Sequence, residues 1–321
     1  MIQIPARPKR RFLPEDFSVT GFDVISIHAD RLLNRLLPDA GALRQWLLDR
    51  SELESVLSED LGWRYIRMTC QTDNASYMRE YQDFIENIQP QLSLVSDQLN
   101  RKALECPALA ELEKEEGFDI MIRSMRKDVE IFREENVPLF TEISTLAQEY
   151  ARISGAMTVE IDGQELTLQQ AAVILQETDR SRREMAWRKI TERRLKDSGV
   201  LDDLFTKMVG LRHRIAINAG FSNFRDYMFR ALGRFDYTPA DCFDFHSSVA
   251  SEVVPLLNRL AADRKSLLGL ETLRPWDKAV DAEGRPPLKA FDGGKDLLER
   301  SIRTFSRLDS YLGNCLSVMK E

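Results

Sequence analysis

The sequence predicts a mainly α-helical fold, a helical array with one β-hairpin at about residues 157–168. Apolar residues recur at helical spacing along most of the chain, and only one segment alternates like β-strands, on both sides of Asp162-Gly163. The 321 residues are 43% hydrophobic and 30% charged. This length and composition allow a sizeable core and two subdomains.

The first part of the chain is predicted to be a helical array. Its first two dozen residues look extended or irregular, and residues 42–57 have a helical pattern. Further on, Pro90 interrupts a long apolar run, so a kink or two separate helices are expected there. The run steps by three and four along one helical face: Tyr81, Phe84, Ile88, Leu92, Val95 and Leu99.

Two more helices are expected before the hairpin. Residues 118–132 read as an amphipathic helix, and Pro138 suits the first turn of the next one. That helix is expected to run to about Ile153, before Gly155. The break after it is the best candidate for a domain boundary, which predicts an N-terminal helical domain over residues 1–154 and a second domain over residues 155–321.

The second domain is predicted to begin with the hairpin and to continue as helices. Thr167 and Gln170 have the spacing of a capping box directly after the hairpin. A helix is expected from about Asp179 to Lys196, stopping near Gly199. Its basic side chains predict either a solvated face with internal ion pairs or a groove wall that attracts acidic peptide ends.

The last third of the chain is also predicted to be helical. Thr238 and Pro239 have the chemistry of a helix start, and the helix is expected to reach about Val254, where Pro255 kinks or divides it. A proline-rich passage follows, and a helical pattern resumes over residues 302–318.

The overall charge excludes some classes of partner. A formal charge of −7 and a pI near 5.3 argue against general nucleic-acid binding, which requires a basic surface. The basic residues at the N-terminus are not followed by an apolar run, so neither a signal peptide nor a membrane anchor is expected. A cytoplasmic location is the resulting expectation.

The cysteines and histidines do not form a recognisable metal-binding pattern. The cysteines are expected to be free and mostly buried thiols, and no two histidines stand four residues apart. We expect the histidines to pack in the core or to support other residues rather than to bind zinc. These residues are Cys70, Cys106, Cys242, Cys315, His28, His213 and His246.

Three motifs carry a family resemblance. They are Gly220-Phe221-x-Asn223-Phe224-Arg225-Asp226-Tyr227, then Arg234-Phe235-Asp236-Tyr237-Thr238-Pro239, and finally Leu273-Arg274-Pro275-Trp276-Asp277. In this order they resemble oligoendopeptidase F, one of the zinc oligopeptidases related to thimet oligopeptidase. The resemblance implies a neurolysin-like or thimet-oligopeptidase-like helical fold with a deep channel for short peptides. It also implies catalysis by a zinc ion on a helix that carries HExxH.

This sequence contains no HExxH. The resemblance therefore implies a truncated chain, in which residues 155–321 are the first part of the catalytic domain and end before the zinc-binding helix. No catalytic or metal-binding residue is assigned, and the chain alone is expected to be inactive and to bind no zinc, although the complete family enzyme requires it. The expected partners are short peptides and a missing or separately encoded catalytic half, with no nucleic acid or membrane. The alternative is an inactive helical protein that binds peptides or assembles with a partner.

Six polar residues of the motifs are the candidates for lining a substrate channel. Their alternative role is structural, with charges and tyrosine hydroxyls tying helices together. They are Arg225, Asp226, Tyr227, Arg234, Asp236 and Tyr237.

Overall fold

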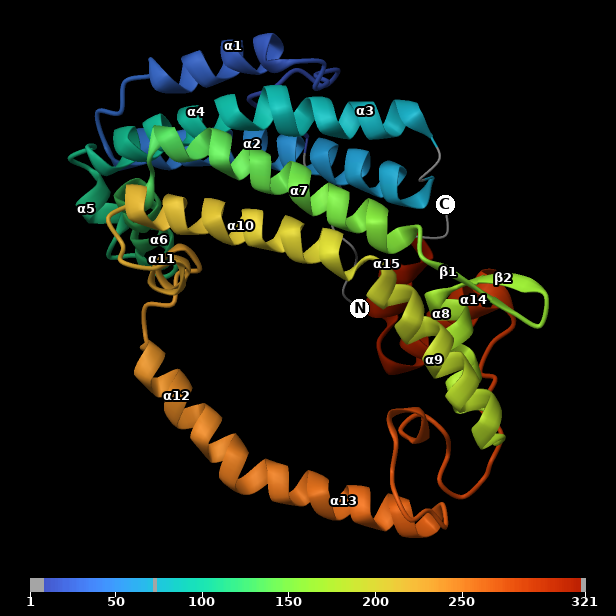
Figure 1. Cartoon of the computed structure of the whole chain (residues 1–321). Helices are drawn as coiled ribbons and strands as arrows, with labels where there is room; N and C mark the ends of the chain where they lie inside the picture. Colours follow the sequence, from blue (N-terminus) through green and yellow to red (C-terminus); the bar gives the residue numbers. More distant parts are fainter. Residues whose placement is uncertain (1–8, 72–73, 319–321) are drawn as a thin grey trace. The chain divides into compact units, whose positions relative to one another are not determined.

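The computed structural model describes residues 9–71 and 74–318 (Figure 1). In that part of the chain the protein is mainly α-helical, with one two-stranded antiparallel sheet. The fold class predicted from the sequence is therefore confirmed. No helix within these ranges is long and apolar enough to cross a membrane.

The chain divides into two compact units. Residues 10–155 and 197–248 form one, named here the helical unit. Lys9 and residues 156–196 and 249–318 belong to the other, named here the hairpin unit. The domain boundary that the sequence suggests near residue 155 stays a prediction.

The helical unit is built from helices of very different length. Their bounds are α1 Phe22–Leu33, α2 Ala40–Cys70, α3 Ala75–Asp83, η1 Phe84–Ile88, α4 Gln89–Leu104, α5 Leu109–Leu112, α6 Phe118–Ile131, η2 Glu134–Asn136, α7 Val137–Gly155, α10 Ser198–Asn218, α11 Phe224–Ala231 and α12 Pro239–Ser248.

The hairpin unit contains both strands and shorter helical segments. Their bounds are β1 Thr158–Ile161, β2 Gln164–Thr167, α8 Leu168–Ala172, η3 Val173–Gln176, α9 Arg180–Lys196, η4 Val249–Val253, α13 Val254–Leu267, η5 Pro275–Asp277, α14 Gly293–Leu308 and α15 Ser310–Val318.

The main core of the helical unit lies where α1, α2 and α4 pack together. Leu32, Leu43 and Trp46 are completely buried there. The indole Nε1 of Trp46 donates a 2.9 Å hydrogen bond to the carbonyl oxygen of Leu32, so its polar atom is satisfied. The helix that carries Trp46 is longer than the predicted segment 42–57, because α2 continues to Cys70.

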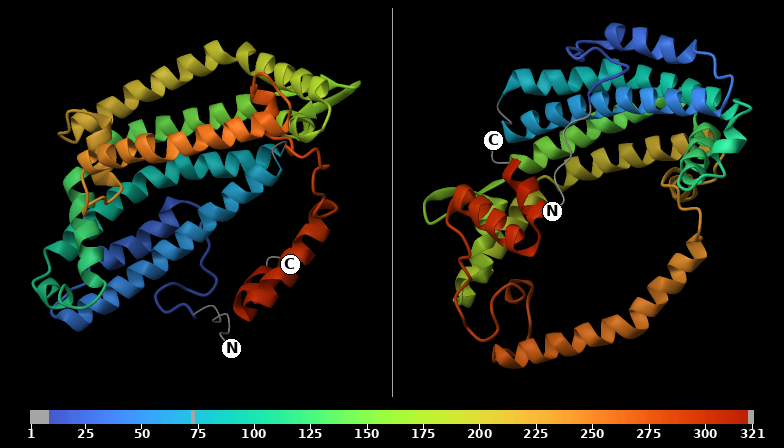
Figure 2. Two further views of the ribbon diagram at one scale, coloured as in Figure 1. Left: turned by 90° about the horizontal axis from the view of Figure 1, so that it is seen from below. Right: turned by 180° about the vertical axis from the view of Figure 1, so that it is seen from behind.

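A second apolar cluster joins α6, α7, α10 and α11. Figures 1 and 2 show α7 beside α10, and α4 packs on both α6 and α7. Asn136 is buried at this junction, where its Nδ2 donates to the Ile215 carbonyl at 3.0 Å and its Oδ1 accepts from Asn218 at 2.8 Å. These bonds offset the cost of burying the amide and fix the start of α7 against α10.

Two internal prolines each follow a five-residue π-helical segment. Pro90 comes after η1 and Pro255 after η4, each as the second residue of the next α-helix. Proline lacks an amide hydrogen and its ring clashes with the carbonyl of the preceding turn, so a locally wider helix accommodates it. The sequence predicts a kink or a division at both sites. In the structure, the helix changes from π-helical to α-helical winding at each of them.

The hairpin forms as predicted. Val159 pairs with Leu166, and Ile161 pairs with Gln164. The two turn residues, Asp162 and Gly163, have φ angles of 54° and 74°, which is the left-handed geometry of a type I′ turn. Directly after β2, Thr167 and Gln170 form the expected capping box at the start of α8.

Candidate functional site

Two of the six predicted channel residues, Arg225 and Asp226, lie in the first turn of α11. Asn223 caps this helix, since its Oδ1 accepts from the Asp226 amide at 3.0 Å and its Nδ2 donates to the Asp226 carboxylate at 2.8 Å. Arg225 donates to the same carboxylate at 2.8 Å. Hydrogen bonds from Arg225 and Asn223 lower the pKa of Asp226. The carboxylate is thus committed to holding the start of the helix.

Tyr227 lies in a different environment, in the second apolar cluster. Its side chain packs edge-to-face on Phe221 at 5.7 Å and stacked on Phe224 at 5.8 Å. Burial raises the pKa of the Tyr227 hydroxyl, with a smaller contribution from Asp128. These surroundings are those of a packed core residue.

The other three candidates lie on the exposed segment between α11 and α12. Arg234 lies over the ring of Phe229 at 5.1 Å, and Tyr237 packs edge-to-face on the same ring at 5.4 Å. Asp236 forms a 2.7 Å ion pair with Arg123 of α6, although its own side chain is 82% exposed. Phe229 and Arg123 therefore position these three residues at the surface.

The intervening Phe235 anchors this segment to α6. The guanidinium of Arg123 lies 4.1 Å from the centre of the Phe235 ring, and that of Arg230 lies 5.2 Å from it. Arg230 also forms an ion pair with Glu130 of α6. The structure thus separates the six candidates into a helix start, a core position and an exposed segment. Their role in lining a channel stays a prediction.

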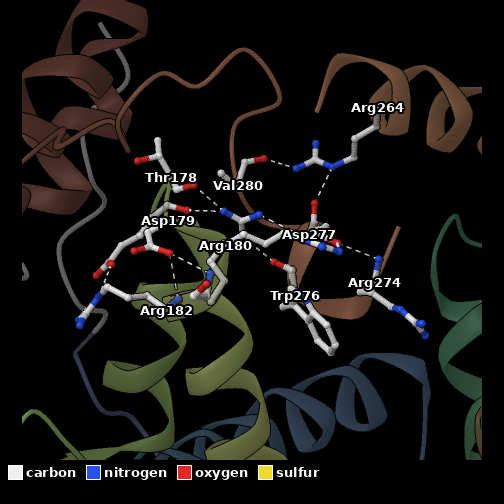
Figure 3. Close-up of polar contacts among 12 residues, drawn as sticks. Thr178, Asp179, Arg180, Arg182, Arg264, Arg274, Trp276, Asp277 and Val280 are labelled. Carbon is white, nitrogen blue, oxygen red and sulfur yellow. Dashed lines mark hydrogen bonds and ion pairs between the residues drawn. The ribbon is translucent and has the colours of Figure 1, made fainter. Parts of the chain in front are cut away.

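A buried arginine–aspartate cluster in the hairpin unit was not predicted. Asp277 of η5 is completely buried and accepts hydrogen bonds from three residues (Figure 3). Arg180 donates through Nε at 3.0 Å and through Nη2 at 2.9 Å, in a fork that engages both carboxylate oxygens. Arg183 donates at 3.0 Å, and the backbone amide of Arg274 donates at 2.9 Å. The buried carboxylate therefore has a counter-charge and a hydrogen-bond donor for each of its oxygens.

The electrostatics of Asp277 follow from these donors. Burial alone raises the pKa of a carboxyl group, because it disfavours the charged form. Hydrogen bonds from Arg180, the Arg274 amide and Arg183 outweigh burial and bring the pKa of Asp277 down to about 2. The Asp277 carboxylate is thus ionised at neutral pH.

The same cluster fixes the backbone around Asp277. Arg183 donates through Nε to the Trp276 carbonyl at 3.0 Å. Arg264 of α13 donates to the Asp277 carbonyl at 2.9 Å and also to the carbonyl of Val280 (Figure 3). Three arginines from two helices therefore hold one short turn.

An aromatic contact completes this arrangement. The indole rings of Trp187 on α9 and Trp276 lie 5.3 Å apart, and Trp276 is 7% exposed. The cluster and this contact join residues that stand nearly one hundred positions apart in sequence, which ties α9 to the end of α13.

The basic helix α9 departs at Arg183 from the solvated face with internal ion pairs that the sequence suggests, and its other basic side chains are not buried. Arg183 is 3% exposed and lies inside the cluster, whereas Arg188 lies at the surface and pairs with Glu184 at 2.7 Å. Both the basic helix and Leu273-Arg274-Pro275-Trp276-Asp277 stand out in the sequence. Their contact with each other was not predicted, and the single aspartate of that motif was the available signal for it.

The residues that the structure describes do not fit a zinc site. No group of three or more histidine, cysteine, aspartate or glutamate side chains suited to a metal ion occurs within residues 9–71 and 74–318. His28 lies in a cage formed by Phe12 at 5.7 Å and Phe17 at 5.1 Å, and burial and the nearby Arg31 charge lower its pKa.

The cysteines are free thiols, as predicted. The expectation that most of them are buried was wrong, because only Cys106 is buried and Cys70 is exposed. Cys242 and Cys315 have intermediate exposure. None of them belongs to a group that could bind a metal in the described ranges.

Two family models match the chain. One, described as the Peptidase M3 N-terminal domain, matches residues 13–132. The other, described as Peptidase family M3, matches residues 173–283, which include both the arginine–aspartate cluster and the six predicted channel residues. Together the matched segments cover more than two thirds of the sequence. No curated protein sequence matches the chain.

Several solved structures have the same fold. PZ peptidase A with inhibitor 2 matches with a TM-score of 0.87 and 20% identity over 96% of this chain and 55% of its own. A structure described as a putative oligoendopeptidase F matches with a TM-score of 0.87 and 21% identity over 97% of this chain and 55% of its own. A third, described as a putative oligoendopeptidase F from Bacillus anthracis str. Ames, has a TM-score of 0.86, 19% identity and coverage of 97% and 57%. The chain thus spans little more than half the length of the structures it matches.

Proposed function

This chain belongs to peptidase family M3, and from that premise we propose that it forms the N-terminal, mainly helical part of a zinc-dependent oligoendopeptidase that hydrolyses short peptides. Peptidases of this family are generally zinc-dependent. Because the residues that the structure describes do not fit a zinc site, we propose that the zinc ligands and catalytic residues belong to a catalytic half outside this sequence. The 321-residue chain alone would then be inactive.

The observation that carries this proposal is an exposed apolar stripe on η4 and α13. No residue of α13 is buried, although its apolar side chains recur at intervals of three, four and seven along one face. Such a stripe is typical of a helix that packs against another element. The stripe consists of Val253, Leu256, Leu257, Leu260 and Leu267, which are 42 to 63% exposed.

The matched structures support the same proposal, because this chain spans about 55% of their length. We propose that the catalytic half packs on the apolar stripe. In the complete fold, the six predicted channel residues would then line the path of a short peptide.

A native sample tests the proposal directly. The protein is isolated from its source cells with an antibody against this chain, and its intact mass and its zinc-dependent cleavage of a short internally quenched peptide are measured together. The recombinant 321-residue chain serves as the comparison. We expect cleavage only in the native sample, together with a species well above 37.0 kDa or a second, co-purifying chain.

Two results would contradict the proposal. Zinc-dependent cleavage by the recombinant chain alone would show that the catalytic residues lie within it. A native species of 37.0 kDa that binds the peptide without cleaving it would instead support the inactive peptide-binding alternative.

A further inference from the structure

An irregular segment at the start of the helical unit contacts both α1 and α2. Residues 10–19, named here the strap, contain no helix or strand. Phe12, Leu13 and Val19 of the strap are 4 to 6% exposed and belong to the main core, and Phe17 packs against it. The strap therefore covers part of this core, and its release would expose apolar side chains.

Polar side chains hold the backbone of the strap. On α2, the Glu52 carboxylate accepts hydrogen bonds from the amides of three consecutive strap residues, the shortest at 2.8 Å. Arg64 of the same helix donates to the Val19 carbonyl at 2.8 Å. Within the strap, Arg10 donates to three backbone carbonyls at 2.8 to 3.1 Å. These bonds fix the strap on α2, while its aromatic side chains meet α1.

His28 of α1 lies against the aromatic side chains of the strap. It is 8% exposed, and its ring packs edge-to-face on Phe12 and Phe17, at 5.7 and 5.1 Å between ring centres. Arg31 approaches its Nδ1 atom at 3.3 Å. A guanidinium has no acceptor, so Nδ1 accepts this bond and carries no proton. The contact therefore requires a neutral imidazole with its proton on Nε2.

No negative charge offsets protonation of this imidazole. Among the described residues, no carboxylate forms an ion pair or a hydrogen bond with His28. On α1, Arg31 and Arg35 both lie over one strap ring, at 4.8 and 5.5 Å from its centre. On α2, Asp49 pairs with Arg35 at 2.6 Å, and Glu52 accepts from the strap amides. The other charged groups of the strap and the basic end of α4 do not bond to the imidazole in the described structure: Arg10, Arg11, Glu15, Asp16, Arg101 and Lys102.

The electrostatics of His28 follow from this geometry. Burial lowers the pKa of the imidazole because it disfavours the charged form, and the Arg31 charge lowers it further. A lowered folded-state pKa contributes stability that is fully present above the ordinary value of 6.5. This stability is lost as the pH falls from there through the folded-state pKa, so acid weakens the contact between His28 and the strap.

We propose that the strap is an acid-sensitive cover of the main core, closed while His28 is neutral and released when His28 binds a proton. In the protonated ring both nitrogens carry protons, so the bond from Arg31 is lost and two positive charges face each other. Release of the strap exposes the imidazole to water, which restores its ordinary affinity for the proton. The inference requires neither zinc nor peptide cleavage, so it does not depend on the proposed function.

Amide hydrogen exchange of the 321-residue chain, at about pH 7.5 and about pH 5.5, tests this inference. The amides of Arg11, Phe12, Leu13 and Phe17 are hydrogen-bonded in the closed strap and report its opening. Their protection factors, which correct for the slower intrinsic exchange in acid, should fall by up to about tenfold at the lower pH. Protection of the α10 amides should stay unchanged and serves as the internal reference.

Two histidine variants separate His28 from other titrating groups. In His28→Asn the amide oxygen can still accept from Arg31 but does not titrate, so strap protection should no longer depend on pH. His213→Asn is the matched control, because His213 is exposed on α10, and it should behave as the unchanged protein does. Equal or higher strap protection of the unchanged protein in acid, or the same pH dependence in His28→Asn, would overturn the inference.

An NMR titration of the unchanged protein gives a second measurement that does not require a variant to fold. The signal of the His28 Cε1 proton should report a pKa below 6.5. The amide signals of the strap should shift over the same pH range. A His28 pKa of 6.5 or above would overturn the inference, because protonation would then favour the closed strap.

Discussion

Helices α4 and α13 begin in the same way but differ in burial. Each follows a π-helical segment and has proline as its second residue, Pro90 in α4 and Pro255 in α13. In α4, Leu99 and Ala103 are 3% and 0% exposed, whereas α13 has no buried residue. The comparison shows that the local sequence determines the winding of a helix, while its burial depends on whether a partner covers its apolar face.

The two helices are also stabilised in different ways. α4 packs on α1, α6 and α7 through apolar side chains. α13 is held through the backbone bonds that Arg264 makes next to Asp277. The position of α13 should therefore depend on the buried polar cluster, and that of α4 on hydrophobic packing.

The largest effect is expected from Asp277→Ala. Removal of this carboxylate leaves Arg183 buried without a counter-charge, which typically costs about 3 to 5 kcal/mol. The free energy of unfolding from urea titration measures the loss. Hydrogen exchange should also become faster in the turn that contains Asp277 and at the end of α13.

Asp236→Ala is the control for this prediction. Asp236 also pairs with an arginine, Arg123, but its side chain is 82% exposed, so solvent screens the interaction. This variant should unfold at nearly the same urea concentration as the unchanged protein. If Asp236→Ala lost as much stability as Asp277→Ala, burial would not be the reason for the large effect at Asp277.

The next effect distinguishes α4 from α13 directly. Leu99→Ala should reduce the free energy of unfolding by about 3 kcal/mol, because it leaves a cavity in the main core. Leu260→Ala on α13 should change it by less than about 0.5 kcal/mol, since this side chain is 55% exposed. Urea titration of both variants measures the difference, and similar losses would show that the stripe on α13 is covered within this chain.

The acid dependence of stability should report on Asp277. Its pKa is lowered to about 2 in the folded protein, compared with about 3.9 in an unfolded chain. A depressed folded-state pKa contributes stability above the unfolded pKa, so about 2 kcal/mol should be lost as the pH falls from about 4 to about 2. Urea titrations across this range measure the slope. Asp277→Asn should flatten it, and an unchanged slope in that variant would exclude Asp277 as its source.

The fold could be predicted largely from local patterns. The turn at Asp162-Gly163, the capping box at Thr167 and the helix start at Thr238 depend on neighbouring residues, and all three are observed. Each pattern acts within a few positions of the chain, which is the range that a single sequence reveals.

The polar cluster could not be predicted in this way. Arg183 and Asp277 meet across 94 positions, and nothing in the sequence of α9 distinguishes the buried Arg183 from the exposed Arg188. The cluster was therefore missed because it depends on pairing between distant residues and on burial, and a single sequence reveals neither.

The smallest effect on stability, and the most direct test of α13, is expected from the double variant Leu257→Glu with Leu260→Glu. Both side chains are more than half exposed, so the free energy of unfolding should change by less than about 0.5 kcal/mol. An uncovered apolar stripe favours association between molecules, and charges on it should oppose that association. Sedimentation velocity should therefore show self-association of the unchanged chain and a larger monomer fraction for the variant. A monodisperse, stable monomer of the unchanged chain would show that the stripe on α13 does not require a partner.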